Sequence, residues 1–179
     1  MKVKGFTIVE LLVVIFIISL ISSIYLVNYR KGQKDMALLR AANKLAQDIR
    51  NTQNLAISAK ECQPCGGKVP FGYGLYLEQS TNSYFIYADT YPGSPATGNG
   101  KYDSGNDVKI ETFNLETGIY IKQISLSPLS VNFSPPDPKI TIGGESNLTD
   151  ATIILALTSD SLKTKTVYIN KAGLVDVRQ

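Results

Sequence analysis

Few of the residue types that carry enzyme chemistry occur in this chain of 179 residues. It contains no histidine and no tryptophan, and only two cysteines. The lack of histidine excludes the Ser-His-Asp and Cys-His arrangements of hydrolases and every metal site built on imidazole. Four groups of side chains could still do chemistry: a cysteine pair, a set of aspartates, a set of basic residues near the C-terminus, and one carboxylate inside an apolar segment.

The two cysteines form the sequence Cys62-Gln63-Pro64-Cys65. Thiol-redox enzymes carry this spacing at a helix N-terminus in a βαβ context, which is not visible here. A zinc site would need two further ligands, and the chain has no other cysteine or histidine. We expect a structural disulfide between Cys62 and Cys65 if this part of the chain lies outside the cytoplasm, with free thiols as the alternative.

Three aspartates lie in the irregular stretch DTYPGSPATGNGKYDSGND, residues 89–107. The simpler interpretation is a surface loop. The alternative is a weak calcium site, because calcium prefers oxygen ligands, although the EF-hand spacing is absent. Calcium is the only cofactor that the sequence suggests, and its ligands would include Asp89, Asp103 and Asp107.

Basic residues gather near the C-terminus, where they could contact the phosphates of DNA. Asp160 and Asp176 lie among them, and a solvated basic face is the simpler and favoured interpretation. The net charge of the chain is only +3, and Lys2 and Lys4 contribute to it ahead of the apolar segment, so bulk charge does not favour nucleic acid. The residues concerned are Lys163, Lys165, Lys171 and Arg178.

One carboxylate, Glu10, is the only charge between Lys4 and Arg30 in an otherwise apolar stretch. About 20 apolar residues span a bilayer, and a charge deep inside one costs on the order of 3 kcal/mol, which makes Glu10 a functional hypothesis. The apolar region of a cleaved secretory signal is shorter than this segment. Such a signal would also end at a small-x-small cleavage site, which is missing here. A plain membrane anchor fits the length but gives Glu10 no role.

The stretch KGFTIVELLVVIFIISLIS resembles the prepilin-type N-terminus of type IV pilins and pseudopilins. The likeness comprises a short basic leader ending in Gly5, then Phe6, then Glu10 as the fifth residue of the mature chain. It implies that a prepilin peptidase cleaves between Gly5 and Phe6 and that the new amine of Phe6 is N-methylated. It also implies three further partners: other pilin or pseudopilin subunits, an inner-membrane assembly platform and the lipid bilayer.

Cleavage would place a positive amine at Phe6, one helical turn from Glu10. The carboxylate could pair with this amine or, as the resemblance implies, with the amine of a neighbouring subunit. Breaking one partner of a buried ion pair costs roughly 3–5 kcal/mol, although the pair itself adds little net stability. We therefore expect Glu10 to act in assembly rather than in folding.

A helical pattern continues beyond the apolar segment, and the helix is expected to cover Phe6–Ala59, softened at Gly32. Apolar residues recur at three- and four-residue spacing, with polar residues on the opposite face. The expected buried face consists of Met36, Leu39, Ala42, Leu45, Ala46, Ile49, Ala56 and Ala59; the expected polar face consists of Lys34, Asp35, Arg40, Lys44, Gln47, Asp48 and Arg50.

After Pro64 the apolar residues alternate with a period of two, which predicts strands. One helix followed only by strands indicates an α+β class, with a long N-terminal helix packed on antiparallel sheets in a pilin-like arrangement. The expected strands are Phe71–Glu78, Ser83–Ala88, Val108–Leu115, Ile119–Ser127, Leu129–Phe133, Lys139–Ile142, Thr152–Thr158, Lys165–Asn170 and Leu174–Arg178.

These patterns divide the chain into a leader (1–5), a transmembrane and filament-core helix (6–29), an amphipathic helix (30–60) and a β-rich extracytoplasmic domain (61–179). We expect a non-enzymatic structural subunit of a type IV pilus or type II secretion filament, in the bacterial inner membrane with a cytoplasmic N-terminus. The layout resembles the H-type minor pseudopilins. The alternatives are a major pilin and a DNA- or cargo-binding minor pilin at a filament tip.

Overall fold

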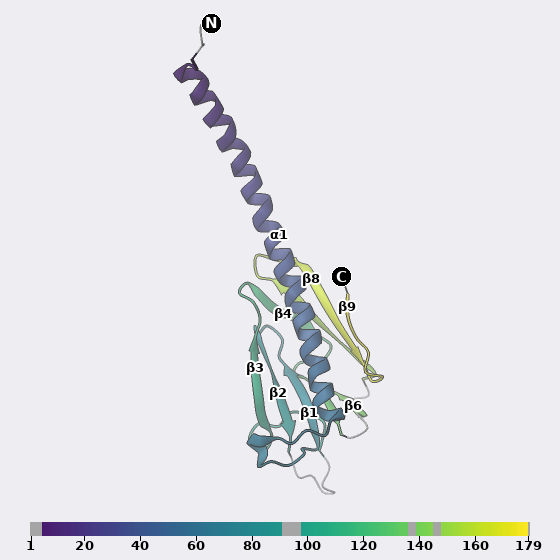
Figure 1. The fold of residues 1–179 in the computed structure, drawn as a ribbon. Coiled ribbons are helices and arrows are strands. Elements are labelled where there is room, and N and C mark those ends of the chain that lie inside the picture. The colour runs from purple at the N-terminus through teal and green to yellow at the C-terminus, as the bar shows by residue number, and fades with distance from the viewer. Residues whose placement is uncertain (1–4, 91–97, 136–138, 145–147, 179) are drawn as a thin grey trace. The chain divides into compact units, whose positions relative to one another are not determined.

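The computed structural model describes residues 5–90, 98–135, 139–144 and 148–178, except for the side chains of Val27 and Asn28. The chain forms two compact units, residues 1–37 and 38–179, and each is described by itself. Helix α1 (Ile8–Ile57) contributes to both units, and every strand belongs to the second (Figure 1). The class is α+β, as predicted.

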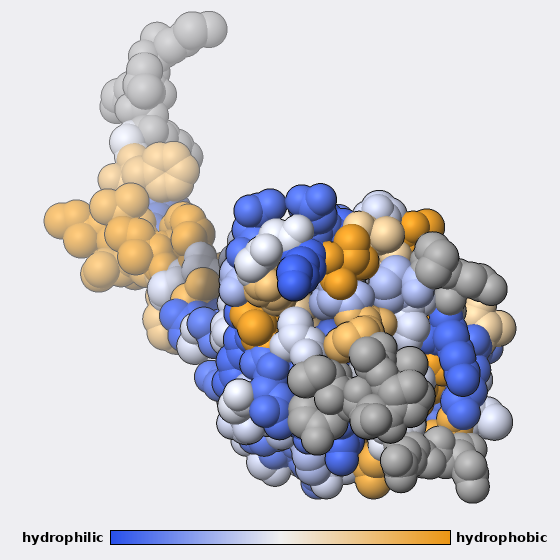
Figure 2. Space-filling view, turned by 90° about the horizontal axis from the view of Figure 1, so that it is seen from below, coloured by the Kyte–Doolittle hydropathy of each residue, from blue (hydrophilic) through white to orange (hydrophobic). Residues whose placement is uncertain are grey.

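The first unit is an apolar helix that leaves its side chains uncovered. All of its described side chains from Phe6 to Met36 are exposed. Two serines within the apolar stretch bond to their own helix: the Ser19 and Ser23 hydroxyls each donate to the carbonyl three residues earlier, at 2.8 Å. Figure 2 shows these apolar residues as a nearly continuous orange surface. This helix alone among the described elements is long and apolar enough to cross a membrane.

Helix α1 continues through Gly32 without a break, and the predicted softening at this glycine stays a prediction. The helix ends in a Schellman motif, in which Lys60 N–H donates to the Leu55 carbonyl and Ala59 N–H donates to the Ala56 carbonyl. Ala59 takes the left-handed position, with φ 43°, that glycine usually fills. The chain therefore turns away from the helix just before the cysteine pair.

All nine predicted strands occur, and they form two antiparallel sheets. Strand β8 begins five residues earlier than predicted, because Asp160 pairs with Leu157 at the hairpin end. The first sheet has the order β3 (Val108–Asn114), β2 (Ser83–Asp89), β1 (Gly72–Leu77), β5 (Leu129–Ser134) and β6 (Lys139–Ile142). The second has the order β4 (Ile119–Ile124), β7 (Asp150–Leu157), β8 (Asp160–Asn170) and β9 (Val175–Arg178).

The second half of helix α1 packs on both sheets through a stripe at three- and four-residue spacing (Figure 1). The predicted face is correct from Ala42 to Ala56, but it begins at Leu38 and Ala41 instead of Met36 and Leu39. Met36 is 59% exposed because it precedes the first buried turn. The buried residues are Leu38, Ala41, Ala42, Leu45, Ala46, Asp48, Ile49, Thr52 and Ala56.

Asp48 is buried, contrary to the prediction that it belongs to the polar face. Its carboxylate accepts a 2.6 Å hydrogen bond from the hydroxyl of Tyr84 on β2. On the other sheet, Arg50 Nη2 donates to the Val175 carbonyl of β9 at 2.7 Å. These two bonds fix one helix to both sheets, and the Asp48 carboxylate is stable inside the core only while it keeps a donor.

Burial in the second unit raises the pKa values of several tyrosine hydroxyls. Burial raises the pKa of Tyr73, Tyr84 and Tyr87 above the ordinary value of 10.0. Burial also raises the pKa of Tyr76 to about 12, and its hydroxyl donates to Glu78 Oε1 at 2.7 Å, which adds to the shift. Folding therefore favours the protonated phenols, so their contribution to stability is full below pH 10 and falls as the pH rises through the folded pKa values.

We predict that Tyr84→Phe lowers the free energy of unfolding by about 1.5–3 kcal/mol, because it leaves a buried carboxylate without its donor. Denaturant titration of the full chain in detergent measures the change. Tyr120→Phe is the matched control, since no hydrogen bond of the Tyr120 hydroxyl occurs among the described residues. Equal stabilities of the two variants would show that the Asp48–Tyr84 bond does not secure the helix.

We also predict that the phenols of Tyr73, Tyr76, Tyr84 and Tyr87 ionise only above the ordinary pKa of 10.0 in the folded chain. Absorbance at 295 nm follows the phenolates, and thermal stability should fall between pH 10 and 12. Tyr76→Phe should remove the step near pH 12. A single transition near pH 10 in the folded chain would contradict the packing described here.

Candidate functional site

The residues around the predicted cleavage point form a capping box at the start of helix α1. Thr7 is the N-cap: its carbonyl accepts the Leu11 N–H, and its Oγ1 accepts the Glu10 N–H at 3.2 Å. In return, Glu10 Oε2 accepts the Thr7 N–H and the Thr7 hydroxyl, each at 2.9 Å. Glu10 thus bonds to the helix terminus that it belongs to.

This arrangement suits an apolar solvent. The first four N–H groups of a helix have no partner within the helix, and an unsatisfied N–H in hydrocarbon costs several kcal/mol. The reciprocal bonds satisfy the N–H groups of Thr7 and Glu10. A carboxylate in this first turn also interacts favourably with the positive end of the helix dipole. Glu10 therefore has a local structural role before any subunit partner is considered.

The predicted cleavage point lies just outside the helix. Gly5 and Phe6 precede the first helical residue, and the Phe6 side chain is 87% exposed. The space where a side chain of Gly5 would lie is open. The Gly5–Phe6 peptide bond is therefore one residue before the N-cap, and Glu10 lies one turn into the helix beyond it.

Thr7 is a site residue that was missed in the sequence reasoning. The signal was present, because Thr7-Ile8-Val9-Glu10 has the T-x-x-E spacing of a capping box ahead of an apolar run. Glu10 is distinguished by its charge in an apolar stretch, whereas the hydroxyl of Thr7 is neutral and common in helices. The structure shows the two side chains acting together.

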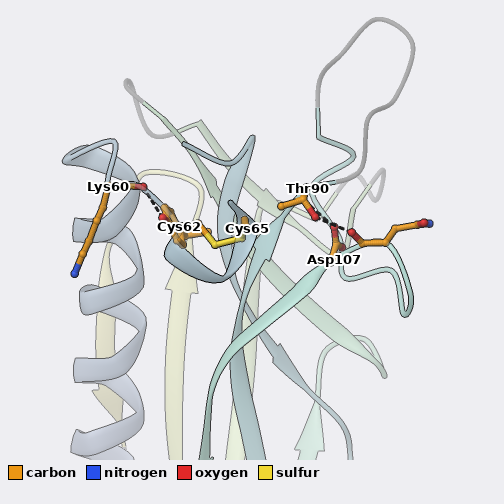
Figure 3. Close-up of a disulfide and its surroundings, with 7 residues drawn as sticks. Lys60, Cys62, Cys65, Thr90 and Asp107 are labelled. Carbon is orange, nitrogen blue, oxygen red and sulfur yellow. Dashed lines mark hydrogen bonds between the residues drawn. A yellow bond between two sulfur atoms is a disulfide. The ribbon is translucent and has the colours of Figure 1, made fainter. Parts of the chain in front are cut away.

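The cysteine pair lies in a short turn after the helix. Cys62 and Cys65 are joined by a disulfide in the structure, with Cα atoms 5.1 Å apart, across the 3₁₀ turn η1 (Gln63–Cys65) (Figure 3). Cys62 is buried, and its N–H donates to the Lys68 carbonyl at 2.9 Å. Close by in the sequence, the Tyr73 hydroxyl donates to the Lys60 carbonyl. The turn thus connects the helix end to β1.

The aspartates of the suggested calcium site serve as hydrogen-bond acceptors. Asp107 accepts the Thr90 N–H at 2.9 Å (Figure 3) and the Asp103 N–H at 2.7 Å. Asp89 accepts the Gly100 N–H at 2.9 Å and the Asn132 amide at 3.0 Å, and Asp103 accepts the Asn99 amide. Across the described ranges, no three acidic, cysteine or histidine side chains are grouped to hold a metal ion. Residues 91–97 of this loop lie outside the described ranges.

These bonds hold the loop over the outer face of the first sheet. Asp89 and Asn132 are buried there, and Tyr102 N–H donates to the Ser130 hydroxyl of β5 at 3.1 Å. Gly72 and Gly74 allow the close packing beneath, because a side chain at either position would overlap Asn132 or Tyr87. The aspartates thus have a folding role that requires no cation, and the calcium site stays a prediction.

The basic residues of the suggested DNA contact do not share one face. Lys163 and Lys165 are two residues apart on β8 and so share a face. Arg178 of β9 pairs with Thr166 and therefore lies on the opposite face from Lys165. Arg178 also has partners of its own: its Nε donates to Asp176 at 3.0 Å, and its guanidinium lies 4.0 Å from the Tyr168 ring centre. Lys171 lies in the turn before β9. The DNA contact is untested, and this geometry does not support it.

A hollow of about 310 Å³ lies on the outer face of the first sheet. Its aromatic residues Tyr76, Phe85 and Tyr102 contact one another, with ring centres 4.8–5.0 Å apart. The Lys109 ammonium lies 4.3 Å from the centre of the Phe85 ring. The ring faces are thus largely used by neighbours within the chain, and the hollow offers no converging catalytic groups.

Comparison with known protein families gives a match at the N-terminus of the chain. The profile of the prokaryotic N-terminal methylation motif matches residues 1–26, the segment that contains Gly5, Phe6, Thr7 and Glu10. No curated protein and no solved structure matches the chain. The match therefore supports a prepilin-type N-terminal segment and gives no information about the β-rich body.

We predict that Asp107→Asn lowers the melting temperature of the full chain by the same amount with and without millimolar calcium. The amide can accept with one atom only, so one of the two loop bonds is lost. Thermal unfolding in detergent, with chelator in the reference sample, measures this. A stabilisation of the unsubstituted chain by calcium that is absent from Asp107→Asn would instead establish a metal site.

Proposed function

The N-terminal methylation motif supports the type IV pilin and pseudopilin family for this chain, and on that premise we propose that the protein is a structural subunit of a type IV pilus or type II secretion filament. It is made as a precursor, cleaved between Gly5 and Phe6, and methylated on the Phe6 amine. It stays inserted in the inner membrane until it is assembled with other subunits into the filament. Within this class, a minor pilin or pseudopilin is our proposal.

The single observation that carries this proposal is the position of the motif on an uncovered apolar helix. The matched residues 1–26 lie within the first unit, whose described side chains are exposed throughout the apolar stretch. A helix with an apolar surface all round is stable only in lipid or against other apolar surfaces. A bilayer before assembly and a filament core afterwards supply these two environments in turn.

We propose that Glu10 changes partner during assembly. In the single chain it accepts both donors of Thr7. In the filament its carboxylate pairs with the methylated amine of a neighbouring Phe6, and each charge then compensates the other away from water. The capping bonds keep Glu10 at the helix terminus, close to where the new amine arises.

The remaining features fit a body outside the cytoplasm. A disulfide such as Cys62–Cys65 persists in oxidising compartments. This supports a topology with a cytoplasmic N-terminus and a periplasmic or extracytoplasmic body. Among the described residues, no contact favours a major pilin or a DNA- or cargo-binding tip subunit instead.

The test separates the two roles of Glu10. Glu10→Gln keeps the capping box, since glutamine also serves at this position, but it removes the charge. We expect this variant to remain membrane-inserted and to be incorporated into filaments at a small fraction of the normal level. Filament purification from cells that express the assembly system, with quantification of the subunit, measures this.

Thr7→Ser is the matched control, because it keeps the capping hydroxyl, and it should assemble normally. Glu10→Ala removes both the cap and the charge and should be at least as defective as Glu10→Gln. Normal incorporation of Glu10→Gln would refute the charge pairing and leave Glu10 with the capping role alone.

A further inference from the structure

Two aromatic residues lie at the C-terminal end of the apolar stretch of helix α1. Tyr25 and Tyr29 are 71% and 53% exposed, and their rings stack with centres 6.4 Å apart. Gln33 Nε2 donates to the Tyr29 hydroxyl at 2.8 Å, which leaves that hydroxyl able to donate in turn. Tyrosine gathers at the boundary between lipid and water, where its ring meets hydrocarbon and its hydroxyl meets polar groups.

The spacing along the helix places this pair at such a boundary. From Ile8 to Tyr29 the helix rises about 32 Å at 1.5 Å per residue, close to the roughly 30 Å thickness of the hydrocarbon core. From Tyr29 to Lys34 the helix rises about 8 Å more. The headgroup layer on each side of a bilayer is about 5–8 Å deep. Residues 30–34 therefore fall at the depth of the lipid phosphates.

The charges at this depth are mostly positive. Arg30, Lys31 and Lys34 are exposed, against the single acid Asp35. Oppositely charged side chains can pair along a helix at a spacing of three or four residues, which relates Lys31 to Asp35. No acidic residue lies three or four positions from Arg30 or Lys34. These two cations are one turn apart, and like charges at that spacing repel each other.

We propose that residues 25–34, the juxtamembrane band, bind anionic phospholipid headgroups. Arg30 and Lys34 contact lipid phosphates, with their aliphatic stems along the helix, and Tyr25 and Tyr29 hold the band at the glycerol level. An anion between the two cations removes their mutual repulsion, which a zwitterionic headgroup does less well. The inference rests on the proposed membrane anchoring and deepens it by naming the lipid class.

The band also has a consequence for assembly. The headgroup contacts stabilise the membrane-inserted state, so a subunit that enters a filament must give them up. Attraction to an anionic surface contributes up to roughly a five-fold change in binding for each cation at low salt, and it weakens as salt screens it. The lipid composition would thus set how firmly the unassembled subunit is held.

The chain contains no tryptophan, so Tyr25→Trp introduces a single tryptophan at the boundary, which can be excited selectively at 295 nm. The full-length variant is reconstituted in vesicles that contain equal amounts of phosphatidylcholine and phosphatidylglycerol. In each sample one of the two lipids carries bromine on its acyl chains, which quenches the fluorescence of a nearby tryptophan. We expect several-fold stronger association with brominated phosphatidylglycerol than with brominated phosphatidylcholine at low salt. The preference should shrink in 0.5 M salt.

Arg30→Gln/Lys34→Gln in this background should abolish the preference. Lys60→Gln/Lys171→Gln, which removes the same charge from the second unit, should leave it unchanged. Tyr29→Trp replaces Tyr25→Trp if the first variant reconstitutes poorly. Equal quenching by the two lipids in the tryptophan variant that keeps Arg30 and Lys34 would overturn the inference while the anchor stands. A fluorophore that neither lipid quenches would overturn the anchor and the inference together.

Discussion

An uncovered apolar helix is the constraint on which the rest of this account depends. From Phe6 to Leu26 each described side chain is exposed, and most are large and apolar. Burying one such side chain is worth about 1.5–3 kcal/mol, so a chain carrying this many cannot remain in water as a single copy. The β-rich body has its own core and does not need this segment for it. The first unit is therefore built for another environment, and its termini must suit that environment too.

The two ends of the apolar stretch solve this problem differently. At the start, Thr7 and Glu10 satisfy each other's N–H groups, so the helix begins with fewer unpaired donors in lipid. At the far end, Tyr25 and Tyr29 lead into a cationic band suited to headgroups. Glu10 thus needs no subunit partner in order to be tolerated in the membrane. Its proposed exchange of Thr7 for an amine during assembly is a change between two satisfied states, which is what a reversible anchor requires.

Much of the fold could be predicted from the sequence because its patterns are local. The period of two predicted all nine strands. The apolar run and the amphipathic pattern after it predicted the helix to within two residues at each end. The errors arose where side-chain partners decide. Asp48 looked like a surface residue, and it is buried because Tyr84, 36 positions away, supplies a donor. Thr7 was overlooked because a neutral hydroxyl gains its role from a reciprocal bond. The basic residues near the C-terminus looked like a cluster, but the pleat of β8 and β9 sends Lys165 and Arg178 to opposite faces.

The central claim is that the bond between Gly5 and Phe6 is a processing site, and intact-mass spectrometry tests it most directly. The full chain is expressed with and without a prepilin peptidase, and the mass of the membrane-extracted protein is compared. Our account predicts the loss of Met1–Gly5 and the gain of one methyl group on Phe6 only when the peptidase is present. A chain that stays uncut with the peptidase, or one that is cut after the apolar stretch, would contradict it.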